Sequence, residues 1–252
     1  MQNKLINRGI GEWLILRYKP VSLFSLRTTY ATNKGGKTLL VPTPYAFKMA
    51  MIDACFRAFG KIDEADRKAR EVFDLIKCCE IRFSPPSVCI VQNTFIKIRQ
   101  EKRDAPKGYF ASTIAYREFC YFNNSELKIA LGVKEYGEEI LNLLVYIASH
   151  INCIGKRGSF WQYLGHMIQD GELSENYTRP KSDSQLSEGH NLWFHELDDF
   201  GQDLCDDKNG FDRISTYGEG KIELGKHRVL TKTIIPYRFK QSSFRFTEYN
   251  KI

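Results

Sequence analysis

The sequence lacks any apolar run approaching the roughly 18–20 residues that a membrane-spanning helix needs. Its start, MQNKLINRGIGEW, also lacks the apolar core and small-residue cleavage site of a secretory signal. With 252 residues, 42% of them hydrophobic and 27% charged, the composition is that of a globular protein. We therefore expect a cytoplasmic protein that does not insert into a membrane, built as one large domain or two small ones.

The seven cysteines include no CxxC pair, which argues against zinc ribbons and dithiol redox sites. Most of them stand in apolar runs, where a free thiol behaves as a small hydrophobic side chain, so we expect reduced, buried cysteines. None of the five histidines has a partner at i+4 or a cysteine at metal-ligand spacing, and none precedes His150. We expect no metal, no cofactor and no catalytic site.

Two familiar binding motifs are present only in incomplete form. The AxxxxGKT stretch at 31–38 lacks the first glycine of a phosphate-binding loop, and LLVPTP follows it where a helix should begin. This argues against NTP hydrolysis, although a glycine-containing loop still lets main-chain amides approach an RNA backbone. The calcium-like DKNG stretch at 207–210 has Cys205 and Thr216 where a calcium loop needs carboxylates. A solvated acidic loop, or a contact for a basic partner, explains it better.

Positive charge is concentrated in the first half of the chain. Residues 1–126 contain 21 Lys and Arg against 12 Asp and Glu, a net charge of +9, whereas residues 127–252 contain 16 against 18, a net charge of −2. This asymmetry predicts one surface for a polyanion and another for protein neighbours. A basic protein without a nucleic-acid ligand would show the same asymmetry.

The first part of the chain predicts a strand and two helices. An apolar, aromatic run indicates a buried strand at Trp13–Tyr18, and the polar, glycine-containing stretch after it indicates a loop. The helix expected at Tyr45–Phe59 is apolar on nearly every side and should be central to the core, and Gly60 ends it. The next helix, Glu64–Cys78, is amphipathic and should lie at the surface.

Two β-rich runs, Ser87–Gln100 and Tyr109–Phe122, flank the polar sequence EKRDAPKG. The proline and glycine of that sequence are turn chemistry, so the segment predicts a protruding β-hairpin with a basic tip. Its cations stand beside aromatic residues, which suits a nucleic-acid contact. They are Lys97, Arg99, Lys102, Arg103 and Lys107, with Tyr109 and Phe110. A solvated loop is the alternative.

The remaining elements complete an α+β fold with antiparallel pairing. We expect a strand at Leu127–Leu131, an apolar helix at Tyr136–Ile151, a polar loop over 170–189 and a closing hairpin within His227–Tyr249. This order fits an RRM-like or ferredoxin-like core with an antiparallel sheet, a protruding hairpin and a β-rich C-terminal portion.

The stretch GKRGSFW at 155–161 places two cations between glycines and two aromatic residues directly after them. Such a stretch offers phosphate contacts beside surfaces on which bases stack. The alternative is a glycine turn that leads into a core strand, with both aromatic residues buried.

Residues 38–60, TLLVPTPYAFKMAMIDACFRAFG, resemble the proline-rich turn and buried first helix, ended by glycine, of the CRISPR-associated RAMP (repeat-associated mysterious protein) superfamily. The stretch is most similar to the fifth Cas protein, the subunit that binds the 5′ handle of the guide RNA (crRNA) in type I Cascade complexes. The preceding strand, the long mid-chain hairpin and the chain length are similar to that family too.

The resemblance implies a non-catalytic RNA-binding subunit that caps the backbone of a Cascade ribonucleoprotein complex in antiviral defence. Its partners would be crRNA, the backbone RAMP subunit and the large subunit, with target DNA met only through the complex. The RRM-like core would comprise 1–93 and 117–169, the hairpin "thumb" Thr94–Tyr116, and an acidic loop region with closing strands 170–252. Besides the thumb, two groups would supply handle-binding residues: Arg27, Tyr30, Lys34 and Lys37, and Lys156, Arg157 and Phe160.

Two other functions stay open. The glycine-rich Tyr217–Gly225 resembles a loop of the related guide-processing endoribonuclease. That family usually uses an N-terminal histidine, which this chain lacks, and about 27 residues follow the loop here. An RNA-cleaving RAMP protein is therefore one alternative. A structural adaptor without nucleic-acid contact, whose basic half packs against acidic partners, is the other.

Overall fold

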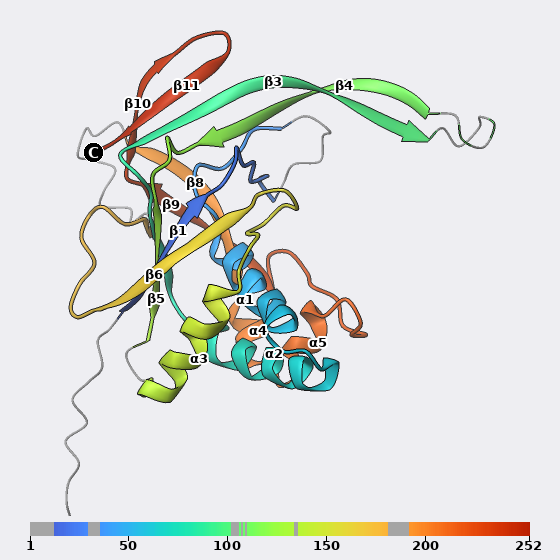
Figure 1. Cartoon of the computed structure of the whole chain (residues 1–252), viewed down its shortest axis with the longest axis vertical. Helices are drawn as coiled ribbons and strands as arrows, with labels where there is room; N and C mark the ends of the chain where they lie inside the picture. The colour runs from blue at the N-terminus through green and yellow to red at the C-terminus, as the bar shows by residue number, and fades with distance from the viewer. Residues whose placement is uncertain are drawn as a thin grey trace, which may run out of the picture.

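The computed structural model describes residues 13–29, 36–101, 106, 108, 110–133, 136–180 and 192–252, without the side chains of 100 and 101. The helices of this α+β chain are interspersed among its strands (Figure 1). They are β1 (Trp13–Pro20), α1 (Pro44–Ala58), α2 (Ile62–Ile76), β2 (Ile81–Ser84), β3 (Val88–Glu101), β4 (Phe110–Tyr121), β5 (Leu127–Gly132), α3 (Glu138–Ser149), β6 (Trp161–Gln169), β7 (Arg179–Pro180), β8 (Trp193–Phe200), α4 (Gln202–Asp206), α5 (Gly210–Ile214), β9 (Arg228–Ile235), β10 (Tyr237–Ser242) and β11 (Phe246–Lys251).

The central sheet has the strand order β2-β5-β1-β6, and every neighbouring pair is antiparallel. In chain order, β1, α1 with α2, β2, β5, α3 and β6 reproduce the β-α-β-β-α-β pattern of a ferredoxin-like domain. In β1, Leu14, Leu16 and Tyr18 belong to the main core, whereas Ile15 joins a small cluster on the opposite face. The α+β, ferredoxin-like fold predicted from the sequence is confirmed.

Helix α1 begins where local chemistry favours it. The Thr43 hydroxyl accepts a hydrogen bond from the Ala46 N–H at 3.1 Å, and Pro44 occupies the first turn, where its missing N–H costs nothing. Residues on several sides of α1 are buried, so the prediction of a core helix is confirmed. Figure 1 shows α1, α2 and α3 together on one side of the central sheet.

Strands β3 and β4 form a long hairpin between β2 and β5 in the chain. Their register runs from the pair Ile90–Tyr121 to the pair Glu101–Phe110, so both predicted strands are confirmed. The base of the hairpin belongs to a second sheet of order β10-β11-β3-β4. The outer part extends away from the rest of the molecule (Figure 1). We call β3 and β4 together the β3–β4 hairpin.

The C-terminal part departs only partly from the sequence prediction. The closing hairpin expected within His227–Tyr249 is present as β10 and β11, which pair antiparallel, but the same stretch also contains β9. Strand β9 joins β7 and β8 in a third sheet, and Pro236 separates it from the paired strands β10 and β11. The short strand β7 lies within the stretch 170–189 that the sequence predicts as a loop.

The acidic stretch Glu196–Asp207, predicted as part of an acidic loop region, instead forms the second half of β8 and all of α4. Buried Leu197, Phe200 and Leu204 anchor it in the main core. Two of its carboxylates, those of Asp198 and Asp199, pair with cations from distant parts of the chain. Local composition therefore misled the prediction, because these partners are far away in the sequence.

All seven cysteines are free thiols, and Cys55, Cys89, Cys120 and Cys205 are buried. Cys78 is exposed, so the prediction of burial is wrong for that residue. Within the described ranges, no helix is both long and apolar enough to cross a membrane.

Candidate nucleic-acid interface

A cavity of about 770 Å³ opens between helix α1 and the loop at 152–160. Its size is within the range of small-ligand sites. Side chains from the segment after β1 and from β8 and β9 complete the lining, so the cavity joins parts of the chain that are far apart in sequence. These additional residues are Leu26, Arg27, Leu39, Asp198 and Arg228.

The lining has an excess of positive charge. Its cations are Arg27, Arg57, Lys156, Arg157 and Arg228, and its carboxylates are those of Asp53 and Asp198. Arg57 pairs with Asp53, and Arg228 pairs with Asp198 while its guanidinium lies 4.1 Å from the centre of the Tyr45 ring. These two cations are therefore neutralised within the protein.

The uncompensated charge lies on the loop. Lys156 and Arg157 are exposed, and neither makes a side-chain hydrogen bond or ion pair with any residue in the described part of the chain. Partial burial, and then the positive charges of Arg117 and Arg27, lower the pKa of Lys156. A negatively charged ligand would relieve this repulsion.

Glycines set the shape of this loop. Gly155 and Gly158 have φ angles of +77° and +93°, which side chains other than glycine adopt at a cost. A Cβ at Gly155 would lie 2.9 Å from a methyl carbon of Leu26, so any larger residue here would have to displace that side chain. The loop closes through a hydrogen bond of 3.0 Å from the Ser159 N–H to the Lys156 carbonyl.

The two aromatic residues after the loop have different environments. Trp161 is buried, and its ring centre lies 4.9 Å from that of Phe24, as expected for a core strand. Phe160 is 50% exposed and lines the cavity. Trp161 is therefore a buried residue of a core strand. Phe160 presents an accessible ring beside Lys156 and Arg157, the two cations without a partner among the described residues.

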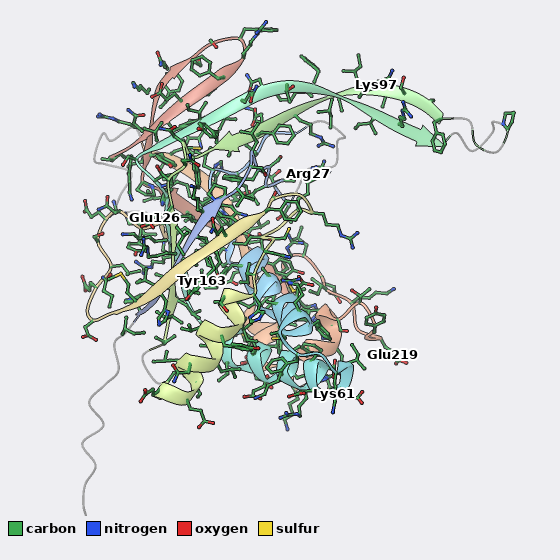
Figure 2. The ribbon with its side chains drawn as sticks, viewed as in Figure 1. Arg27, Lys61, Lys97, Glu126, Tyr163 and Glu219 are labelled. Carbon is green, nitrogen blue, oxygen red and sulfur yellow. The ribbon has the colours of Figure 1, made fainter. Side chains whose placement is uncertain are left out.

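The segment between β1 and α1 joins the cavity to the base of the β3–β4 hairpin. The Phe24 and Cys120 backbones exchange hydrogen bonds of 3.1 and 2.7 Å, and the Gly36 N–H donates to the Tyr116 carbonyl at 3.3 Å. The Glu118 carboxylate accepts from the Thr38 N–H at 2.9 Å. Arg27, on this segment, lines the cavity, and Figure 2 shows it beneath the β3–β4 hairpin.

One face of the β3–β4 hairpin carries both cations and apolar side chains. The register pairs Phe95 with Tyr116 and Lys97 with Ile114, and alternate residues along each strand share a face, so Arg99 lies on it too. Phe95 is 64% exposed and Ile114 73% exposed. Figure 2 shows Lys97 on the extended part of the hairpin, whereas Lys61 lies at the opposite end of the molecule.

The structure brings only some of the predicted binding residues together. Arg27, Lys156, Arg157 and Phe160 share the cavity. Lys37 is exposed beside the hairpin base, and Lys97 and Arg99 are exposed on the hairpin. The remaining candidates lie outside the described residues: Tyr30, Lys34, Lys102, Arg103 and Lys107.

Sequence reasoning missed three cavity residues: Tyr45, Arg57 and Arg228. Arg57 had a detectable signal, since it follows Asp53 by one turn on an otherwise apolar helix. Arg228 had none, because its position at the cavity depends on the pairing of β8 with β9. The same holds for Arg117, whose surroundings come from segments distant in sequence.

None of the histidines in the described ranges lines the cavity. His227 is buried, and its Nδ1 accepts a hydrogen bond from the Glu223 N–H at 3.2 Å. His195 Nε2 accepts from the Leu40 N–H at 3.2 Å, and burial lowers the pKa of His195 to about 4. At the calcium-like stretch, Asp207 pairs with Arg213 at 2.5 Å, so its carboxylate already has a cationic partner.

Comparison with known proteins places the chain beside CRISPR-associated proteins. No protein-family model matches it. It is similar to the CRISPR-associated protein Cas5 of Archaeoglobus fulgidus, with 24% identity over 172 residues that cover 65% of this chain and 73% of that protein. A crystal structure of a CRISPR protein from the same organism aligns over 95% of this chain and 92% of its own, with a TM-score of 0.42 and 13% identity.

Proposed function

We propose that this chain, a Cas5-like RAMP protein as the sequence resemblance predicted, is a non-catalytic subunit that binds the 5′ handle of crRNA in a type I Cascade effector complex. Its similarity to a Cas5 protein supports a CRISPR-associated subunit. The observation that carries the finer proposal is the cavity, where two cations with no partner among the described residues stand beside an exposed aromatic ring.

The chemistry of the cavity suits single-stranded RNA. Lys156 and Arg157 can neutralise backbone phosphates without giving up a partner in the described part of the chain. The exposed ring of Phe160 offers a surface on which a base can stack. Glycines on either side of the cations let main-chain amides approach a phosphate closely.

In this proposal the β3–β4 hairpin extends the RNA-binding surface and reaches the neighbouring subunits. Its exposed face combines Lys97 and Arg99 with Phe95 and Ile114, so it can contact both phosphates and apolar protein surface. The proposed partners are the backbone RAMP subunit and the large subunit. Target DNA would be met only through the assembled complex, which would act in the cytoplasm.

Replacing Lys156 and Arg157 with alanine tests the proposal. Both side chains are exposed and unpaired in the described part of the chain, so the melting temperature should change little. Affinity for a labelled repeat RNA that carries the 5′ handle should fall about tenfold, as for the loss of one or two charge-assisted contacts. Fluorescence anisotropy at fixed salt measures this change.

A variant with Lys61→Ala and Lys221→Ala is the matched control. It removes the same charge from two other exposed positions, so its affinity should stay near that of the unaltered protein. Equal losses in both variants would mean that only total charge matters. Unchanged affinity in the cavity variant would contradict the assignment of the cavity.

A further inference from the structure

Arg117, on β4 near the base of the hairpin, is a buried cation without a partner among the residues that the structure describes. It is only 8% exposed, and its Nε and Nη1 atoms are enclosed without a hydrogen-bond acceptor. Within the described part of the chain no carboxylate forms an ion pair with it. A buried guanidinium that has no counter-ion destabilises a fold.

Neighbouring groups increase this cost. Gly36 bridges to Arg117 across the edge of β4, and a Cβ at Gly36 would lie 3.9 Å from Arg27 Nε, so Arg27 passes close to this edge. Lys156 is within electrostatic reach of both arginines, whose charges contribute to its lowered pKa. Three positive charges therefore converge where β4, the segment after β1 and the loop at 152–160 meet.

The nearest acid in sequence does not offset them. The Glu118 side chain is directed to the opposite face of β4. There its two oxygens accept from the Thr38 N–H at 2.9 Å and the Tyr116 hydroxyl at 2.9 Å. Burial, and then this contact with Glu118, raise the pKa of Tyr116 to about 12, so the hydroxyl remains a donor. Both oxygens of the Glu118 carboxylate therefore already have hydrogen-bond partners at the hairpin base.

We propose that Arg117, together with Arg27 and Lys156, forms a binding site for a single phosphate group. The planar guanidinium of arginine offers paired N–H donors that match phosphate oxygens. The second part of this proposal rests on the proposed function: the phosphate belongs to the backbone of the guide RNA, where the RNA passes from the cavity to the hairpin. One phosphate would then fix the position of the RNA against the hairpin base.

The first experiment uses inorganic phosphate and no RNA. Arg117→Met removes the charge but keeps an apolar stem, so the free variant should melt at the same temperature as the unaltered protein or above it. Millimolar phosphate should raise the melting temperature of the unaltered protein, relative to sodium chloride of equal ionic strength, and this shift should disappear in Arg117→Met. Arg70→Met is the control, because Arg70 pairs with Asp66 and Asp212; it should melt lower and keep the phosphate shift.

The second experiment uses the handle RNA. Arg117→Met should weaken binding about tenfold and reduce the slope of log affinity against log salt by roughly 0.7, the value for one phosphate on a single strand. Arg117→Lys keeps the charge without the paired donors. Its affinity for the handle RNA should lie between those of the unaltered protein and Arg117→Met.

The two experiments separate the parts of the proposal. If Arg117→Met melts lower and keeps the phosphate shift, Arg117 is structural and the phosphate site is overturned, whatever the protein does with RNA. If the phosphate shift depends on Arg117 but handle RNA binds both proteins alike, the site stands and its assignment to the guide is overturned. Stabilisation by polyglutamate but not by phosphate would overturn the phosphate site in favour of an acidic protein partner.

Discussion

Lys48 and Arg117 are both buried cations, but their surroundings differ. Lys48 is 1% exposed, and its ammonium donates to the Asp199 carboxylate at 2.8 Å and to the Lys77 carbonyl at 3.0 Å. Arg117 makes no comparable bond within the described residues. Since a buried charge with fixed partners is satisfied by the fold, of these two cations only Arg117 should respond to added anions.

His195 should make the protein less stable in mild acid. Its pKa is about 4 in the folded protein, because burial disfavours the charged ring, against about 6.5 when the chain is unfolded. As pH falls from about 6.5 towards 4, the unfolded chain takes up this proton first, so unfolding becomes more favourable. The contribution from pH 7 to pH 5 is about 2 kcal/mol of unfolding free energy.

Urea denaturation at pH 7 and pH 5, with His195→Gln as the comparison, measures this contribution. Glutamine does not titrate, and its side-chain oxygen can still accept from the Leu40 N–H that now donates to His195. The variant should therefore lose less stability between the two pH values. An equal loss in both proteins would mean that other groups cause the acid sensitivity.

The histidines also bear on the endoribonuclease alternative. We expect purified protein to leave precursor repeat RNA intact, with or without magnesium, because no histidine of the described ranges lines the cavity. Gel electrophoresis after prolonged incubation tests this. If discrete products appear and are lost in His227→Ala or in the exposed-site variant His166→Ala, the chain is a nuclease and the non-catalytic assignment is wrong.

The β3–β4 hairpin should contribute to assembly more than to folding. Beyond its base, the side chains of Lys97 and Arg99 are exposed. Replacing these two residues, together with Lys102, Arg103 and Lys107, by alanine should leave the melting temperature nearly unchanged. Reconstitution of the complex on guide RNA should weaken by about 1 kcal/mol or more, through lost phosphate contacts.

A substitution at the base of the β3–β4 hairpin distinguishes its contribution to folding from its contribution to assembly. Val91 is buried at the hairpin base, so Val91→Ala should lower the melting temperature and leave the affinity of the folded protein for RNA unchanged. If the multiple alanine variant fails to fold, the outer hairpin is part of the core. If it folds and assembles normally, the hairpin does not contact the guide or its neighbours.

At the level of elements, local signals predicted those parts whose structure depends on nearby residues. The Thr43 cap, Pro44 and a run of apolar residues define α1 within one short stretch. Strand β8 could not be predicted in this way, because its acidic residues are typical of a solvated loop. Their ion pairs with Lys48 and Arg228 form only in the folded chain. The same is true of the cavity: the local stretch from Lys156 to Phe160 could be predicted from the sequence, whereas Arg228 could not.

For the whole molecule, affinity for guide RNA should depend steeply on salt. The N-terminal half carries a net charge of +9, and Lys97, Arg99, Lys156 and Arg157 are all exposed. If these four cations each neutralise one phosphate, the slope of log affinity against log salt should be roughly −3. Filter binding at several salt concentrations measures it, and a flat profile would contradict binding through phosphates.

The pairing of β11 with β3 determines when β3 can complete its strand pairing during translation. Strand β3 is flanked by β4, which follows at once, and by β11, which places Glu248 opposite Ile90. A hairpin alone is only marginally stable in water, and distant strand pairing is slow to form. While the chain emerges from the ribosome, β3 therefore keeps one unpaired edge until β11 has been made. Nascent chains are consequently most exposed to edge-to-edge association during this interval, and chaperones that bind extended segments would protect them then.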